Sequence, residues 1–387
     1  MICKLKTLMV LGFAAILSAM FYGVPPAAAA EEAKEEKKPL MSEEIKKKIE
    51  AILDKHMTEK NSPAAILGVW TPDGDAIVVR GKSDVKAGTD AKATDRFRIA
   101  SVTKTFTAAM LLLLVDEKKL GLDDKLSKFY PEIKNADKIT IRQLLDHTSG
   151  IRSYTEMEEF DKFVKTEPLK KWTGEELLKI VSAAEPAFEP GEGFMYSNTN
   201  YLLAGLIFEK LSGNKFAGEL KKRILEPLGM KDTYYAEGPQ IEGPHFHGYD
   251  ETVDVTLFDP SGPNFAGAIV STLGDLKIWV EAMRDGKLLS KETQAERLKF
   301  VGKEKNPESG YGLGMMSWGD FRGHNGAITG YTIVALGSRE PAVTVVCMMP
   351  MCASNLKGAP ESVFKEVTEL IAEKALHAKV KFDKVIK

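Results

Sequence analysis

A serine and a lysine three residues apart stand at the start of one of the most apolar runs of the chain, RIASVTKTFTAAMLLLL (98–114). Residues at this spacing share one face of a helix, so Lys104 can reach the hydroxyl of Ser101. A serine hydroxyl becomes a good nucleophile only when a neighbour takes its proton. Burial between apolar walls lowers the pKa of a lysine and leaves a neutral amine that can do this. The pattern therefore favours a serine nucleophile with a lysine base.

The Ser-x-x-Lys spacing alone is weak evidence, because it occurs five times in the chain. The other four serines are Ser83, Ser212, Ser354 and Ser362. Three of these lie in Gly- or Lys-rich segments, and the fourth opens a helix with a charged face. At Ser101 a predicted helix start coincides with an apolar surround. A simple helix-capping serine remains the alternative at this position.

A second polar group is Tyr196-Ser197-Asn198, on a predicted loop just before a helix. Of the ten tyrosines, Tyr196 alone has an asparagine two residues later. A neighbouring cationic lysine makes a phenol easier to deprotonate, so Tyr196 can act as base for Ser101 and as acid for a leaving group. Asn198 offers an amide that can hold both Lys104 and a substrate carbonyl. The alternative is an ordinary capped helix start with an aromatic residue packed beside it.

A third group, Gly323-His324-Asn325-Gly326-Ala327, falls between two strand-like runs. A glycine here lets a ligand approach the backbone closely. The N–H of Ala327 can form an oxyanion hole with that of Ser101, and His324 can orient a substrate carboxylate. A glycine-rich hairpin turn with an incidental histidine is the alternative.

In the order Ser-x-x-Lys, Tyr-x-Asn and His-x-Gly, these motifs resemble those of the penicillin-recognising serine hydrolases, and most closely the class C β-lactamases and serine D-alanyl-D-alanine carboxypeptidases. The resemblance runs from about residue 45 to 375. Other similar stretches are ITIRQLLDHTSGI (139–151), EPGEGFMYSNTNYLLAGLI (189–207), EPLGMKDTYY (226–235), AGAIVSTLGDL (266–276) and GHNGAITGY (323–331).

The resemblance implies a nucleophile at Ser101, proton handling by Lys104 and Tyr196, and substrate contact by Asn198. It places His324 where many β-lactamases carry a lysine. The His-x-Gly form looks more like the carboxypeptidase and esterase side of the family. Substrate binding is accordingly expected at Asn198, His324, Gly326 and Ala327.

The elements that position these groups follow from hydrophobic periodicity and turn signals. Strand-like runs lie at both ends of the chain, and the middle reads as mainly helical. We therefore expect an α+β fold, with an antiparallel sheet flanked by helices beside a mainly helical domain. The sheet domain is assigned to 42–121 and 266–387, and the helical insertion to 122–265. The predicted elements are helices near 42–57, 101–117, 140–147, 174–184, 198–212, 216–226 and 361–375, a hairpin turning at 71–74, and strands within 311–318, 330–338 and 342–350.

The first 30 residues have the features of a secretory signal peptide. Lys4 and Lys6 precede an apolar segment at 8–21, and Ala28-x-Ala30 is the expected cleavage site. The apolar segment is shorter than the roughly 20 residues of a membrane-spanning helix. Residues 31–41 form a charged linker. We therefore expect a periplasmic or extracellular protein without a stable membrane anchor after cleavage.

The overall composition excludes several functional classes. The 387 residues carry a net charge of −2 and show no basic stripe, so no nucleic-acid partner is expected. No phosphate-binding loop or dinucleotide fingerprint occurs, and no organic cofactor or metal is needed. Buried thiols are favoured over a disulfide for Cys347 and Cys352. A packing or surface role is favoured for His245 and His247, and a structural role at a helix end for His147.

These observations predict a secreted serine hydrolase that works through an acyl-enzyme on Ser101. The favoured substrate is a short peptide or small molecule with a carbonyl next to D-alanine. A β-lactamase or esterase of the same family is one alternative. A non-catalytic sensor of β-lactams or wall peptides, which is acylated and stays acylated, is the other.

Overall fold

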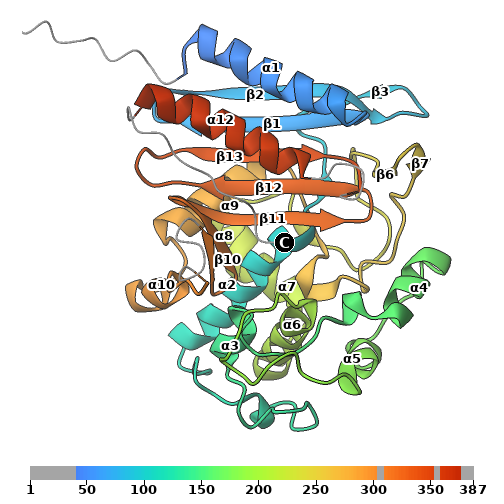
Figure 1. The fold of residues 1–387 in the computed structure, drawn as a ribbon, viewed down its shortest axis with the longest axis vertical. Coiled ribbons are helices and arrows are strands. Elements are labelled where there is room, and N and C mark those ends of the chain that lie inside the picture. The colour runs from blue at the N-terminus through green and yellow to red at the C-terminus, as the bar shows by residue number, and fades with distance from the viewer. Residues whose placement is uncertain (1–40, 303–308, 353–357, 376–387) are drawn as a thin grey trace, which may run out of the picture. The chain divides into compact units, whose positions relative to one another are not determined.

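The computed structural model describes residues 41–302, 309–352 and 358–375 (Figure 1). The predicted signal peptide and all but the last residue of the predicted linker lie outside these ranges. The described residues all fall within one compact unit. No helix in this part of the chain has the length and apolar character needed to cross a membrane.

Eight strands, each antiparallel to its neighbours, form the main sheet in the order β3-β2-β1-β13-β12-β11-β10-β9. The antiparallel sheet expected from the two ends of the chain is confirmed, because Leu67 of β1 lies opposite Cys347 of β13. The strands are β1 (Ala64–Thr71), β2 (Gly74–Asp84), β3 (Thr89–Asp90), β9 (Ser309–Gly312), β10 (Met315–Trp318), β11 (Phe321–Ile328), β12 (Tyr331–Gly337) and β13 (Thr344–Met349).

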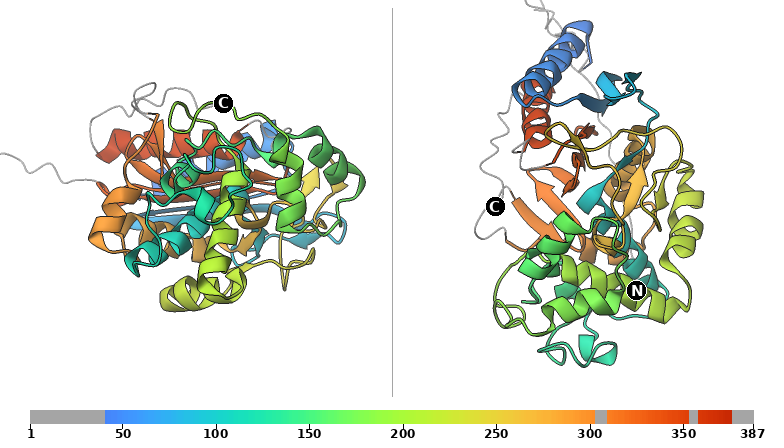
Figure 2. Two further views of the ribbon diagram at one scale, coloured as in Figure 1. Left: turned by 90° about the horizontal axis from the view of Figure 1, so that it is seen from below. Right: turned by 90° about the vertical axis from the view of Figure 1, so that its right-hand side faces the viewer.

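Both faces of the sheet are buried, so its central strands are apolar on both sides. Ala65 and Leu67 of β1 face a core that includes α1 (Glu43–Glu59) and α12 (Ala359–Ala375). Ile66, between them in sequence, faces the larger core on the opposite side, as the alternation of a strand requires. Figures 1 and 2 show α1 and α12 side by side over the same face.

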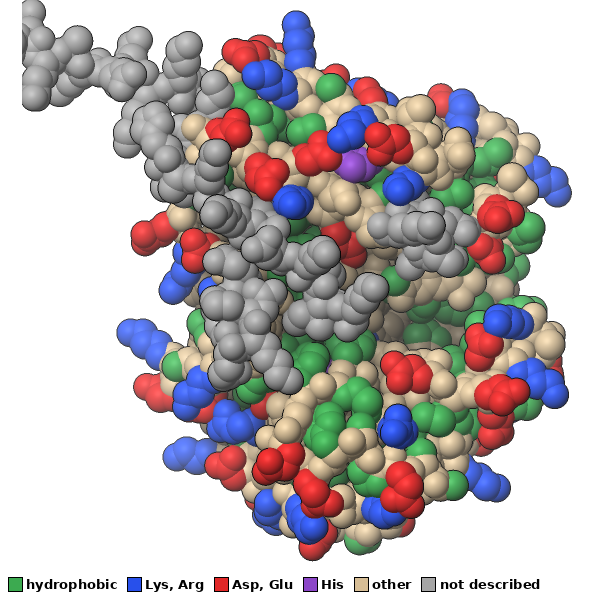
Figure 3. Space-filling view, in the orientation of Figure 1, with side chains coloured by type: hydrophobic (Ala, Val, Ile, Leu, Met, Phe, Trp, Pro, Cys, Tyr) green, Lys and Arg blue, Asp and Glu red, His purple; other side chains and the backbone are tan. Residues whose placement is uncertain are grey.

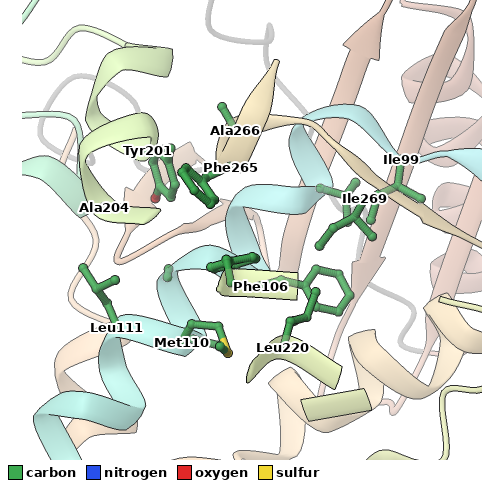
Figure 4. Packing of buried hydrophobic residues seen from close by; sticks show 14 of the residues in the cluster. Ile99, Phe106, Met110, Leu111, Tyr201, Ala204, Leu220, Phe265, Ala266 and Ile269 are labelled. Atoms are coloured by element: carbon green, nitrogen blue, oxygen red, sulfur yellow. The ribbon is translucent and has the colours of Figure 1, made fainter. Parts of the chain in front are cut away.

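The larger core surrounds α2 (Thr103–Asp116), which is apolar nearly all round. A helix of this kind must be enclosed on every side. Phe106 stacks on Trp279 at 3.9 Å between ring centroids. Figure 4 shows the same helix packed against Tyr201, Phe265 and Leu220. The lysine of the Ser-x-x-Lys motif, Lys104, therefore lies in a helix that is almost entirely buried.

Mainly helical segments extend the molecule below the sheet in Figure 1. Tyr234–Tyr235 from this part pairs with Ile269–Ser271, which also pairs with Phe97–Arg98, so the two predicted domains share a small sheet. The further helices are α3 (Ile141–Leu145), α4 (Glu158–Thr166), α5 (Gly174–Ser182), α6 (Asn198–Ser212), α7 (Phe216–Leu220), α8 (Glu226–Leu228), α9 (Leu273–Asp285) and α10 (Lys291–Arg297). The short strands are β4 (Phe97–Arg98), β5 (Tyr234–Tyr235), β6 (Tyr249–Asp250), β7 (Val253–Asp254) and β8 (Ile269–Ser271).

Three helices, α4, α9 and α10, were not among the predicted elements, and one further segment was assigned differently. The segment containing His324 was expected between strands, but it lies inside β11. Its two glycines hid the strand, because glycine weakens a strand pattern. A Cβ at Gly323 would lie 2.1 Å from the carbonyl oxygen of Ala335, so close packing dictates the glycine there.

Cys347 and Cys352 are both free thiols, as favoured from the sequence. Cys347 is buried in β13, and the Sγ of Cys352 accepts a hydrogen bond from the N–H of Gly330 at 3.1 Å. His245 and His247 stack on each other, and His247 pairs with Asp254 at 2.7 Å.

Candidate active site

Ser101 lies in a tight turn, the 3-10 segment Ala100–Val102, directly before α2. Ala100 adopts a left-handed backbone conformation with φ of 48°. This conformation is unfavourable for a residue with a side chain and often marks a functional turn. The turn presents Ser101 at the wall of a cavity while the helix behind it stays buried.

Lys104 lies one turn along, with its Nζ 2.9 Å from the Oγ of Ser101. The same nitrogen donates a hydrogen bond to the carbonyl oxygen of Ala266 at 2.9 Å. The side chain is 0% exposed, and no carboxylate lies within salt-bridge distance among the described residues. Burial therefore lowers the pKa of Lys104 well below its ordinary value. Burial therefore favours the neutral form of the amine beside the serine hydroxyl.

Tyr196 lies on the other side of the serine, on the loop before α6. Its hydroxyl interacts with Ser101, and its ring centroid lies 4.9 Å from the Nζ of Lys104. Burial raises the pKa of the Tyr196 phenol. This direction is opposite to the sequence expectation, because burial disfavours the charged phenolate. Burial therefore favours the protonated phenol of Tyr196 and the neutral amine of Lys104.

Asn198, the first residue of α6, lines the cavity together with Ser101. Its Nδ2 donates a hydrogen bond to the Oγ1 of Thr155 at 2.8 Å. The predicted contact with Lys104 is replaced by the carbonyl oxygen of Ala266. Asn198 thus faces the substrate space and is held in place by Thr155.

Gly326 and Ala327 lie near the end of β11, next to the turn that carries Ser101. A Cβ at Gly326 would lie 2.8 Å from the carbonyl oxygen of Ile99. The sequence argument assigned this glycine to the close approach of a ligand, whereas the structure shows the close approach of the nucleophile turn. Ala327 lines the cavity together with Ser101.

His324 differs from its expected role, because it is 1% exposed and does not line the cavity. Its Nε2 lies 2.9 Å from the hydroxyl of Tyr311, and its Nδ1 contacts the carbonyl oxygen of Asn325. The carbonyl oxygen of Asn325 can only accept a hydrogen bond, so Nδ1 carries the proton of the ring. Nε2 therefore accepts a hydrogen bond from the hydroxyl of Tyr311. Burial, and then the nearby Lys104, lower the pKa of His324 to about 3. The ring is therefore neutral and supports the site from behind the substrate space.

We predict that His324 makes the protein less stable in mild acid. Its pKa is about 3 in the folded chain and about 6.5 in the unfolded chain, so only the unfolded chain gains a proton between these values. Stability is full above pH 6.5 and falls as the pH is lowered towards 3. At pH 5 the loss is about 2 kcal/mol from this one group. Urea unfolding at pH 7 and pH 5 should show a smaller loss in His324→Gln than in wild type. Equal losses would contradict the assignment.

The cavity next to Ser101 has a volume of about 290 Å³ and is mainly apolar. Figure 3 shows this face of the molecule hollowed to the right of centre, with hydrophobic side chains inside. Charged groups in its wall are Glu167, Lys170 and Asp259. The Lys170 ammonium lies 3.7 Å from the ring centroid of Trp172. The apolar and aromatic lining comes from Phe160, Val164, Pro168, Trp172, Phe258, Pro263 and Ile328.

Sequence reasoning missed the aromatic wall of this cavity and the support behind Tyr196. The wall comes from α4 and from two loops, around 168–172 and 258–263, which carry no motif. Tyr311 and His147 pack against Tyr196 or its neighbours. The stretch LLDHTSG was the one available signal for His147.

A family model described as Beta-lactamase matches residues 49–349. The chain belongs to the β-lactamase family. It is a family of serine hydrolases with the fold of β-lactamases and penicillin-binding proteins. The motifs that carry Ser101, Lys104 and Tyr196 lie within the matched residues. The predicted family and fold are therefore confirmed.

Solved structures from this family superpose over most of the chain. A D-stereospecific amidohydrolase from Streptomyces sp. is 29% identical, with a TM-score of 0.72, over 82% of this chain and 97% of that one. A D-amino acid amidase from Ochrobactrum anthropi SV3, in complex with L-phenylalanine amide, is 29% identical, with a TM-score of 0.74, over 85% and 99%. Penicillin-binding protein 4* of Bacillus subtilis is 29% identical over 63% of this chain. The match covers 58% of that relative's length and 40% to 49% of several relatives named Protein flp.

Proposed function

We propose that this protein is a secreted hydrolase that cleaves amide bonds on the carbonyl side of a D-residue, as a D-alanyl-D-alanine carboxypeptidase does. One observation carries the proposal, namely the buried Lys104 amine at 2.9 Å from the Ser101 hydroxyl. A solvated ammonium is a poor base, whereas a buried amine can take a proton at neutral pH.

In the proposed reaction, Lys104 removes the proton of Ser101 as its Oγ attacks the substrate carbonyl carbon. The negative charge that forms on the carbonyl oxygen is held by the N–H groups of Ser101 and Ala327. Tyr196 donates its proton to the leaving nitrogen and recovers a proton from the Lys104 ammonium, so that both groups return to their neutral forms. The acyl-enzyme is then released by water, and Lys104 and Tyr196 handle the proton in the reverse sense.

Three substrates distinguish the proposal from its alternatives. A D-alanyl-D-alanine peptide should release D-alanine, and a fluorescent penicillin should label Ser101. Hydrolysis of a p-nitrophenyl ester alone would support an esterase, and rapid penicillin turnover would support a β-lactamase. Stable labelling without product from any substrate would support a sensor. Absence of labelling by every acylating probe would contradict an acyl-enzyme on Ser101.

A second candidate, a D-amino acid amidase, is favoured by the cavity. Asp259 is 9% exposed and lines the cavity beside the aromatic ring of Phe258. Its Oδ1 accepts two hydrogen bonds from Ser261, and no cation of the described residues lies within 4.0 Å of its carboxylate. An unpaired carboxylate in an apolar wall is suited to the free ammonium of an amino acid amide.

We predict that Asp259→Asn discriminates between amide substrates. The variant keeps an acceptor for Ser261 and removes the charge. Its kcat/KM for D-phenylalanine amide should fall about tenfold, the loss of one moderate charge contact. Its kcat/KM for N-acetyl-D-phenylalanine amide should stay unchanged, because this substrate has no ammonium. An equal fall for both substrates would mean that Asp259 only supports the cavity wall.

A further inference from the structure

His147 holds the backbone on both sides of Tyr196. It follows α3 and has a left-handed backbone conformation with φ of 64°. Its carbonyl oxygen accepts the N–H of Met195 at 3.0 Å, and its ring Nδ1 accepts the N–H of Ser197 at 3.1 Å. The two residues that flank Tyr196 are thus both bound to this one histidine.

The hydrogen bonds also define the protonation state of the ring. Asn200 presents its Nδ2 to the Nδ1 of His147 at 3.2 Å, because its Oδ1 accepts the hydroxyl of Ser149 at 2.8 Å. With N–H donors from Ser197 and Asn200, Nδ1 must be unprotonated, so the proton of the neutral ring is on Nε2. Burial, with Lys104 and His324 nearby, lowers the pKa of His147 well below its ordinary value. The neutral ring, with Nδ1 free to accept, is therefore the favoured form.

The imidazole ring supports the phenol ring as well as its backbone. The ring centroids of His147 and Tyr196 lie 4.4 Å apart, and the ring of Tyr311 packs edge-on against His147 at 4.6 Å. The side chain is 0% exposed, and its Nε2 has no hydrogen-bond partner among the described residues. A buried N–H without a partner costs stability. A smaller apolar residue would avoid that cost, so the histidine is explained by what Nδ1 and the ring contribute.

We infer that His147 is the positioning residue for Tyr196. His147 directs the phenol oxygen at Ser101 and does not itself touch the substrate. The inference rests on the proposed role of Tyr196 in proton transfer. Loss of the Nδ1 acceptor frees the loop at Ser197 and displaces the phenol. A displacement of about 1 Å can slow a reaction about 100-fold.

Two substitutions of His147 distinguish the contribution of the Nδ1 hydrogen-bond acceptor from that of the ring's volume. Asn places its amide oxygen close to the position of Nδ1 and tolerates the left-handed conformation, whereas Gln places its amide near the position of Nε2. We expect His147→Gln to acylate with fluorescent penicillin about 100-fold more slowly than wild type. We expect His147→Asn to recover at least about tenfold of that loss. His56→Gln is the matched control, because His56 is also buried but contacts Glu366 far along the sequence on α12.

The decisive measurement combines these variants with Tyr196→Phe. If His147 acts through Tyr196, His147→Gln should have no further effect on acylation in the Tyr196→Phe background. Additive losses, or equal rates for Gln and Asn, would overturn the inference. Wild-type acylation by Tyr196→Phe alone would instead refute the proposed role of Tyr196. Should the Gln variant fail to fold by circular dichroism, the comparison of Asn with wild type in both Tyr196 backgrounds gives the same test.

Discussion

Ser101→Ala is expected to abolish covalent labelling by fluorescent penicillin and to lower hydrolysis of any accepted substrate about 10⁶-fold. The loss is this large because the hydroxyl forms the bond to the acyl group, and it is the hydroxyl that bonds to the Nζ of Lys104. The fold should persist, since the hydroxyl is half-buried at the cavity wall. Mass spectrometry of the protein after incubation with penicillin measures the adduct directly.

The chain provides its own control for this variant. Ser212 and Lys215 have the same spacing, but Ser212 bonds to the main-chain carbonyl of Asn214, and Lys215 pairs with Glu209 at 3.5 Å on the surface. Ser212→Ala should therefore label at the wild-type rate. An adduct that persists in Ser101→Ala, or disappears in Ser212→Ala, would contradict the assignment of the nucleophile.

The comparison of these two serines also shows which features the sequence can predict and which it cannot. Spacing identifies both pairs, and the apolar run after Ser101 identifies the one that is buried. The hairpin turning at 71–74 and the strands of β12 and β13 follow from local signals as well. All of these depend on residues close together in the chain.

Features that depend on distant residues are the ones that sequence reasoning missed or misassigned. Lys104 bonds to the carbonyl of Ala266, which is 162 residues away, and a main-chain partner leaves no trace in residue type. Position 326 requires a glycine because the carbonyl oxygen of Ile99 packs against it, and not because a ligand does. His324 was placed against the substrate because motif spacing does not show which way a strand residue faces. Its place inside β11, paired with Tyr311 at 2.9 Å, turns it away from the cavity.

Burial also determines whether the pKa of Tyr196 is raised or lowered. A sequence argument assumes a charged lysine beside the phenol, and that charge would lower the pKa. The structure buries Lys104 fully and Tyr196 in part, and this burial favours the neutral form of each group. The proposed division of roles, with a neutral amine as base and a phenol as donor, rests on burial, which spacing alone does not reveal.

Lys104→Met tests this division through two independent measurements. We expect acylation to fall about 10⁴-fold, because methionine fills the space of the lysine stem but takes no proton. Lys215→Met, at the surface pair, should acylate normally. A Lys104→Met protein that acylates at more than about a tenth of the wild-type rate would remove Lys104 from the base role.

The second measurement is stability as a function of pH. The pKa of Lys104 lies well below 10.5 in the folded chain and at about 10.4 in the unfolded chain, so between these values only the unfolded chain holds the proton. The wild-type protein should therefore gain stability from this group as the pH rises towards 10. In Lys104→Met this gain should disappear from urea unfolding curves. If both proteins show the same slope, Lys104 is charged in the folded state, and the serine would need another base.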